Sequence, residues 1–416
     1  GLLIAVGVYE AAPWISTKWV QAETLPTEAV RQSVTMMGIS IAFQWPVGLY
    51  SGGLMGLERQ VLQNGLVAIF GTIRGLGAVL ALWLISPTIN VFFGWQILVS
   101  IIQVGAMGVF FWRNIPAGSR AAHIDMYLLR GVWRFTVGMG ATGFVTFLLS
   151  QLDKVVLSRI LSLRLFGYYN LANQLNTATR MSSASIFVAF LPRMSALFAK
   201  EDKSALRSLY HQGCQLVSLV VLPASAVIAL FSYEIILIWT QNETVAQMAS
   251  PIASLLVVGS ALNSMMGIPY DLTVACGWAS FGFYQNLISA ILLVPVMLVL
   301  ATHFGGIGAA TAWLALNIGY VLISAPIIHS RMLRGQLRQW YLVDVGRPLV
   351  LSLVVTSFGR WLIPRNAALW LKLILIAALW FIALVICAAS LPHIRQRAWQ
   401  MMNYGRKFLY VFGKGQ

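Results

Sequence analysis

Residues Ser150 to Asn173, with the sequence SQLDKVVLSRILSLRLFGYYNLAN, place charges beside long apolar segments, and the fold prediction starts from this stretch. Small and polar residues recur every three or four positions along the helix predicted to lead into it: Gly138, Thr142, Thr146, Ser150 and Asp153. Residues at these spacings share one face of a helix, so the predicted helix carries a polar stripe.

A second polar stripe follows on the next predicted helix. Its members also fall at steps of three and four: Asn170, Asn173, Thr177 and Arg180, with Asn176 and Ser183 alongside. An unpaired polar group costs several kcal/mol in lipid, so neither stripe is expected to face acyl chains. We therefore expect the two stripes to line a shared, water-filled interior.

The composition is that of a membrane protein. Of the 416 residues, 59% are hydrophobic and 10% are charged, whereas about 25% are charged in a typical globular domain. Twelve apolar segments are long enough, or nearly so, to cross a bilayer: 2–15, 33–56, 62–86, 89–112, 132–158, 166–191, 208–233, 245–266, 279–302, 306–329, 341–363 and 367–391. Since open sheets cannot exist in lipid, we predict an all-α polytopic membrane protein with twelve transmembrane helices.

The opening stretch also carries a family resemblance, through the run D-K-x-x-L-S-x-x-L-S followed by F-G-Y-Y-N-L-A. The residues concerned are Asp153, Lys154, Leu157, Ser158, Leu161, Ser162, Gly167, Tyr168, Tyr169 and Ala172. The segments GGLMGLERQVLQNG at 52–65 and GIGAATAW at 306–313 add to it. Together they resemble bacterial polysaccharide flippases, the O-antigen (Wzx-type) branch of the multidrug/oligosaccharidyl-lipid/polysaccharide superfamily.

This resemblance implies two helical lobes around a central, V-shaped cavity that opens alternately to each side, with drive from an H⁺ or Na⁺ gradient and no cofactor. It also implies fourteen helices in the intact protein. If Asp153 lies on the family's seventh helix, four helices precede it where six are expected. We therefore expect two N-terminal helices to be missing from this chain.

The net charge of +16 is distributed over loops that flank the apolar segments. When the connections are assigned alternately to the two sides, 18 of the 28 Lys and Arg residues fall on one side and 6 on the other. The positive-inside rule makes the richer side cytoplasmic, and the C-terminus lies there. A nucleic-acid partner is not expected, because the basic residues do not gather on one domain.

The predicted organisation has five parts. Residues 1–112 form an N-terminal lobe, 113–131 a cytoplasmic linker, 132–330 a C-terminal lobe, and 331–392 two additional transmembrane helices. Residues 393–416 form a basic amphipathic tail on the anionic inner surface of the membrane.

The candidate substrate-binding residues are the intramembrane cations and amides. We assign to the cavity Arg74, Lys154, Arg180, Asn173, Asn170, Thr177, Gln44 and Asn317. Cations hold diphosphates through charge-assisted hydrogen bonds, and amides and hydroxyls exchange hydrogen bonds with sugars. For Lys154 and its neighbour Asp153 the alternative is a position at the periplasmic membrane interface, and for Arg180 the alternative is a structural ion pair.

Three carboxylates in apolar surroundings are candidates for ion coupling: Asp153, Glu10 and Glu234. Glu10 and Glu234 could instead be partners of an arginine. The five histidines are scattered, with no ligand spacing near a carboxylate, so no metal site is expected.

The sequence therefore predicts a transporter and not an enzyme. We expect a flippase that carries an undecaprenyl-diphosphate-linked oligosaccharide, such as an O-antigen or exopolysaccharide unit, to the periplasmic leaflet of a bacterial inner membrane. Membrane lipids are expected as further partners. Other membrane proteins of polysaccharide assembly are candidate partners that the sequence does not decide. The alternatives are a cation-coupled multidrug exporter of the same superfamily and a membrane glycan polymerase or ligase, although no outer loop is large enough to hold acceptor sugars.

Overall fold

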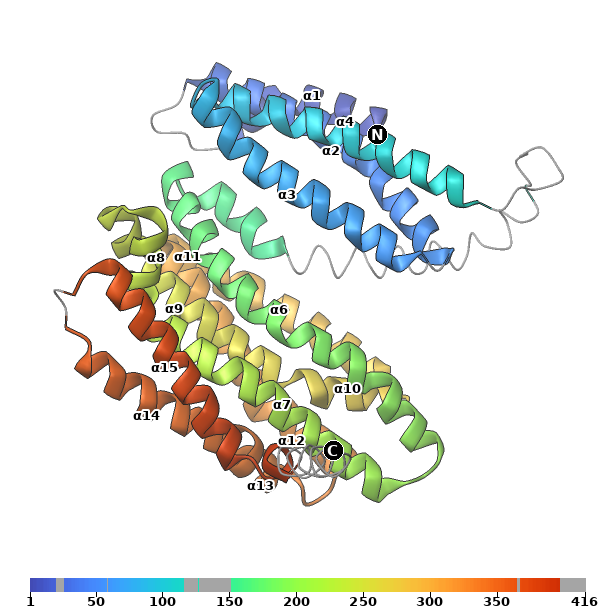
Figure 1. Ribbon diagram of the computed structural model, residues 1–416, viewed down its shortest axis with the longest axis vertical. Coiled ribbons are helices and arrows are strands. Elements are labelled where there is room, and N and C mark those ends of the chain that lie inside the picture. Colours follow the sequence, from blue (N-terminus) through green and yellow to red (C-terminus); the bar gives the residue numbers. More distant parts are fainter. Residues whose placement is uncertain (20–25, 58, 116–125, 127–150, 365–366, 397–416) are drawn as a thin grey trace, which may run out of the picture. The chain divides into compact units, whose positions relative to one another are not determined.

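The computed structural model describes residues 1–19, 26–57, 59–115, 126, 151–364 and 367–396, and every regular element labelled in them is a helix (Figure 1). The predicted all-α class is therefore confirmed. Eight helical segments of the described part are long and apolar enough to cross a membrane, so the chain is a multi-pass membrane protein. The count of twelve stays a prediction, because most of the expected helix at 132–158 lies outside the described residues.

The chain divides into two compact units, which are described separately. The first comprises residues 1–150 with 162–164, and the second comprises 151–161 with 165–416. The linker expected at 113–131 and the boundaries expected for the two lobes, the additional helices and the tail stay predictions. The cavity expected between the two lobes also stays a prediction.

The first unit is a bundle of long helices around a small apolar core. Its elements are α1 (Leu2–Trp14), η1 (Ile15–Trp19), α2 (Thr27–Gly56), α3 (Gln60–Leu84) and α4 (Ile89–Asn114). Helix α4 packs along α2 and α3, and α1 packs along α2. The core between α2, α3 and α4 contains Leu54, Phe70, Val99 and Met107.

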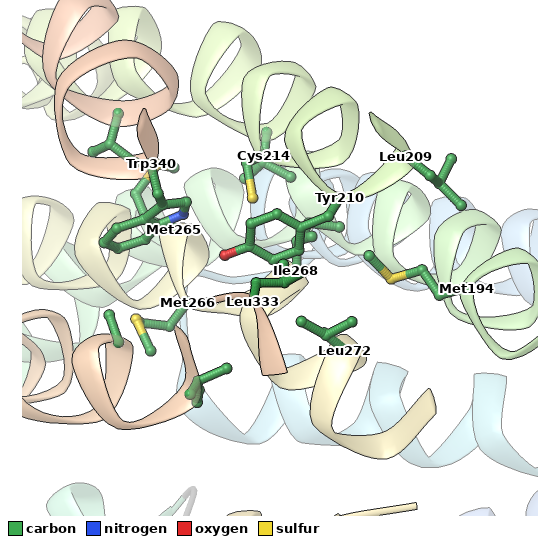
Figure 2. Close-up of a cluster of buried hydrophobic side chains, with 14 of the residues drawn as sticks. Met194, Leu209, Tyr210, Cys214, Met265, Met266, Ile268, Leu272, Leu333 and Trp340 are labelled. Atoms are coloured by element: carbon green, nitrogen blue, oxygen red, sulfur yellow. The ribbon is translucent and has the colours of Figure 1, made fainter. Parts of the chain in front are cut away.

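The second unit holds the remaining helices. They are α6 (Leu163–Ala199), α7 (Lys203–Leu230), α8 (Ser232–Thr240), α9 (Glu243–Met265), α10 (Gly267–Ala275), α11 (Ala279–Gly319), η2 (Tyr320–Ser324), α12 (Ala325–Met332), α13 (Leu337–Gln339), η3 (Trp340–Gly346), α14 (Arg347–Leu362) and α15 (Leu369–Ser390). Helix α7 lies at the centre, since it packs against α9, α14, α15 and η3. One of its apolar clusters, with Tyr210 and Cys214 beside Trp340 and Met265, is shown in Figure 2.

Helix α11 contains a sharp break at Gly305, whose φ of 59° and ψ of −138° are not helical. An L side chain rarely adopts this φ, which explains glycine at this position. A Cβ on Gly308 would meet the carbonyl of Leu300, so the two arms lie close together after the break. The predicted separation into segments 279–302 and 306–329 agrees with this position.

A buried histidine–carboxylate pair connects α7 to η3. Asp344 is 0% exposed and His211 is 2% exposed, and His211 Nδ1 and Asp344 Oδ2 form a hydrogen bond. Gln215 Nε2 donates to Asp344 Oδ1 at 2.9 Å, and the backbone N–H of His393 donates to Gln215 Oε1 at 3.0 Å. This network therefore joins three parts of the chain: α7, η3 and the segment after α15.

The network generates a test of the fold. Replacing Asp344 with Ala leaves His211 and Gln215 without their buried acceptor, which lowers the free energy of unfolding by about 3 kcal/mol. Removing the whole pair with Asp344→Leu and His211→Leu costs less than the single change, because no buried charge is left unpaired. Thermal unfolding of the purified variants in detergent measures both effects, and an Asp344→Ala protein as stable as the parent would contradict this role.

Candidate functional site

Helix α6 presents two different polar surfaces. Its buried side faces its neighbours in the second unit, where Ser183 Oγ donates to Ser264 Oγ on α9 at 3.4 Å. Tyr169, Asn176 and Thr179 are also buried on this side. Asn176 Nδ2 donates to Asn173 Oδ1 at 3.0 Å, and Asn170 donates to the Phe166 carbonyl within the same helix. The flanking residues of the predicted stripe thus contribute to helix packing.

The opposite side of α6 is exposed and is made largely of polar and small residues. It contains Gln174, Thr177, Ala178, Arg180, Met181, Ser182, Ala184 and Ser185. We call this set the open α6 face. It lies on a helix long and apolar enough to cross a membrane, and its Thr177 and Ser182 hydroxyls donate to the carbonyls of Asn173 and Thr179 on the same helix. Of the predicted stripe, Thr177 and Arg180 are exposed here, whereas Asn170 and Asn173 are half-buried.

Arg180 is the charged centre of the open α6 face. No acceptor for its guanidinium is found among the described residues, and only its backbone carbonyl is used, by Ser183 Oγ. The alternative of a structural ion pair for Arg180 therefore has no described partner. An intramembrane arginine that is exposed needs water or an anion, because lipid cannot solvate the charge.

Asp153 and Lys154 each have a separate partner, although they are adjacent in sequence. Asp153 accepts a hydrogen bond of 2.9 Å from the hydroxyl of Tyr169, which is 1% exposed. Lys154 Nζ donates to Gln151 Oε1 at 2.8 Å. Both charged residues are half-buried. The other members of the stripe predicted before Asp153, at 138, 142, 146 and 150, lie outside the described residues.

Arg74 belongs to a polar chain that crosses the first unit. Its guanidinium donates to Gln103 Oε1 at 2.8 Å and to Ser100 Oγ at 3.4 Å. Ser100 Oγ lies 3.3 Å from Ser40 Oγ, which accepts from Gln44 Nε2 at 3.2 Å. The structure thus connects the predicted residues Arg74 and Gln44 through two serines. All of the described partners are neutral, so the positive charge of Arg74 is solvated but not cancelled.

The three remaining predicted residues lie apart from these groups. Asn317 is 0% exposed and joins two helices, because its Oδ1 accepts from Asn263 Nδ2 at 2.8 Å. Glu10 is exposed on α1. Glu234 is 8% exposed and forms an ion pair with Arg360 on α14. Of the two roles considered for Glu234, the arginine partner is the one for which the structure provides a contact.

Sequence reasoning missed two features of the second unit. The first is the His211–Asp344 pair, because 133 residues separate the two and neither has a local partner. A lone carboxylate in an apolar segment was the available signal. The second is Gln174, which extends the open α6 face three positions before Thr177 and could have been found from the same periodicity.

Comparison with known proteins finds similarity both in sequence and in fold. A family model described as polysaccharide biosynthesis protein matches residues 118–243. The lipopolysaccharide biosynthesis protein WzxC of Escherichia coli (strain K12) is 24% identical over 242 residues, which cover 56% of this chain and 47% of WzxC. The match thus spans about half the length of this relative.

The fold also has a solved counterpart. The structure of the lipid II flippase MurJ in an inward closed conformation superposes with a TM-score of 0.70, over 93% of this chain and 81% of MurJ, at 13% identity. At this identity the likeness concerns the fold. The resemblance to polysaccharide flippases that the sequence motifs indicated is confirmed: the chain is a multi-pass membrane protein similar in sequence to polysaccharide biosynthesis proteins and in fold to a lipid flippase.

Proposed function

We propose that this chain carries out the translocation step of a polysaccharide flippase, moving an undecaprenyl-diphosphate-linked oligosaccharide from the cytoplasmic to the periplasmic leaflet of a bacterial inner membrane. The single observation that supports this most is the open α6 face, where Arg180 is exposed on a helix of membrane-spanning length. The similarity to WzxC and MurJ supports the class of substrate.

The physical problem of the reaction is solvation. A lipid-linked oligosaccharide carries many hydroxyl groups and a diphosphate, and all of them lose water when they enter the hydrocarbon core. Thr177, Gln174 and the serines of the open α6 face can exchange hydrogen bonds with sugar hydroxyls. Arg180 supplies a charge-assisted hydrogen bond to a phosphate oxygen. The polar groups of the substrate thereby exchange contacts with water for contacts with the protein, so the free energy of the substrate in the protein differs little from that in water.

Arg74 is the second proposed diphosphate contact. Its guanidinium donates hydrogen bonds to the neutral acceptors Gln103 and Ser100 within the first unit, and Ser100 in turn contacts Ser40. Neutral partners fix the position of a guanidinium without occupying its charge, and its remaining N–H groups stay available to an anion. Lys154 is proposed as a further cationic contact.

Asp153 is the coupling group that fits best among the three predicted carboxylates. It is half-buried and is held by the buried hydroxyl of Tyr169, whereas Glu234 is already paired with Arg360. A single carboxylate that accepts one hydrogen bond keeps capacity for H⁺ or Na⁺. We propose that its ion occupancy drives the cycle and that the C-terminus is cytoplasmic.

The multidrug alternative is disfavoured by the sign of the exposed charge. A site for cationic drugs needs carboxylates and aromatic faces, but the exposed charge at the centre of the open α6 face is an arginine.

Export of surface polysaccharide tests the cationic contacts. In a strain that depends on this chain, Arg180→Ala lowers the export rate by about tenfold or more, the cost of one charge-assisted hydrogen bond. Arg180→Lys keeps the charge and retains part of the rate, and Arg74→Ala lowers export by a similar factor. The measurement is the amount of surface polysaccharide in strains whose membranes contain equal amounts of the variant and the parent protein. Lipid-linked units are expected to accumulate in the cytoplasmic leaflet of the variant strains.

A matched control lies on the same helix. Arg193 is also exposed on α6 but lies outside the open α6 face, close to the C-terminal end of the helix. Arg193→Ala is therefore expected to export normally. Normal surface polysaccharide in both the Arg180→Ala and the Arg74→Ala strains would contradict the proposed role of these cations.

A further inference from the structure

A pocket lies in the second unit where α14 ends and α15 begins. It has a volume of about 290 Å³ and is lined in part by Glu234 of α8, Arg360 and Trp361 of α14, and Lys372 of α15. Both α14 and α15 belong to segments of membrane-spanning length that end or begin within a few residues of the pocket. The pocket therefore lies at the level where apolar spans meet the lipid headgroups.

Two exposed tryptophans are consistent with this level, one that lines the pocket and one two residues before the pocket-lining Lys372. Trp361 is 78% exposed and Trp370, in the first turn of α15, is 66% exposed. Exposed tryptophans concentrate at the membrane–water interface, because the ring is apolar and its N–H is polar.

Glu234 lines this pocket and has unused hydrogen-bonding capacity. Glu234 is only 8% exposed, and its carboxylate oxygen Oε1 accepts a hydrogen bond from Arg360. The second oxygen, Oε2, is buried and has no hydrogen-bond partner among the described residues. A buried carboxylate oxygen without a donor is unfavourable, so a ligand that brings N–H groups gains from occupying this position.

The same pocket offers two cations. Arg360 lies 5.1 Å from the ring of Phe231, measured from its Cζ to the ring centroid, and one of its nitrogens binds Glu234. A guanidinium has five N–H groups, so further donors remain for a phosphate. Lys372 lines the pocket from the other helix. The pocket thus combines one carboxylate, suited to an ammonium group, with two cations, suited to a phosphate.

We propose that this pocket binds the phosphoethanolamine headgroup of a membrane phospholipid. The primary ammonium donates to Glu234 Oε2, and the phosphodiester accepts from Arg360 and Lys372. The volume is close to the lower limit of about 300 Å³ for pockets that hold drug-sized ligands, which suits a headgroup with the acyl chains outside. This lipid is a bound partner and not the transported substrate, so the inference does not depend on the proposed function.

Lipid retention by the purified full chain tests this proposal. The protein in detergent is titrated with phosphatidylethanolamine, phosphatidylcholine or phosphatidylglycerol, and bound lipid is counted by native mass spectrometry. Phosphatidylethanolamine is expected to bind about tenfold more tightly than the other two, because choline has no N–H and glycerol has no positive charge.

Two variants assign the contacts. Glu234→Gln is expected to reduce the preference for ethanolamine over choline to about twofold or less, since the charge that attracts the ammonium is lost. Lys372→Met keeps the Glu234–Arg360 pair and weakens all three lipids by a similar factor, so it remains informative if Glu234→Gln does not fold. Lys203→Met, an exposed cation at the start of α7, is the control and leaves binding unchanged.

Three results would overturn the proposal. They are equal binding of the three lipids, an ethanolamine preference that survives in Glu234→Gln, and displacement of the lipid by inorganic phosphate alone. The last result would identify a simple anion site. None of them would bear on polysaccharide export, which is measured separately.

Discussion

The constraint on which this structure depends is that a polar group within hydrocarbon needs a partner. Many intramembrane hydroxyl groups in the described residues meet it through a carbonyl of their own helix, and several other polar side chains meet it through neighbours on other helices. Asp344 is held by His211 and Gln215, and Asn317 is held by Asn263. Each contact joins elements far apart in sequence, so these polar groups connect helices in addition to the apolar clusters.

Arg180 differs from these residues, because no acceptor for its guanidinium is found among the described residues. Its charge lies on an exposed face of α6, while the buried face of the same helix carries Ser183, which contacts Ser264 on α9, and Asn176, which contacts Asn173 of the same helix. One helix thus separates its polar residues into a packed set and an open set. A protein that only had to be stable in lipid would gain by replacing the open set with leucine, because polar residues exposed to acyl chains are unfavourable.

The sequence was sufficient for features that depend on local composition. The segments predicted at 89–112 and 367–391 correspond closely to α4 (Ile89–Asn114) and α15 (Leu369–Ser390), and the break at Gly305 lies between two predicted segments. Hydropathy is a local quantity, and glycine tolerates the dihedral angles that this break needs.

Pairings between distant residues could not be predicted in the same way. Glu234 and Arg360 are 126 residues apart, and nothing in the sequence near either residue indicates that the other is its partner. The polar stripe of α6 was recognised, but its periodicity could not separate Thr177 and Arg180, which are exposed, from Asn176 and Ser183, which are buried. That distinction depends on where α9 packs, and a single sequence does not encode it in any local pattern.

The most direct test of the account is whether the open α6 face contacts water in the membrane. In a protein without its three native cysteines, Thr177→Cys and Ala184→Cys are treated in membranes with a water-soluble, membrane-impermeant maleimide, beside Val354→Cys and Ile374→Cys on the exposed apolar surfaces of α14 and α15. Since only a hydrated thiolate reacts, the account predicts labelling of the two α6 positions at least about tenfold faster than the controls. Labelling of Thr177→Cys and Ala184→Cys as slow as that of Val354→Cys would show that this face lies against lipid or protein, and would contradict the account.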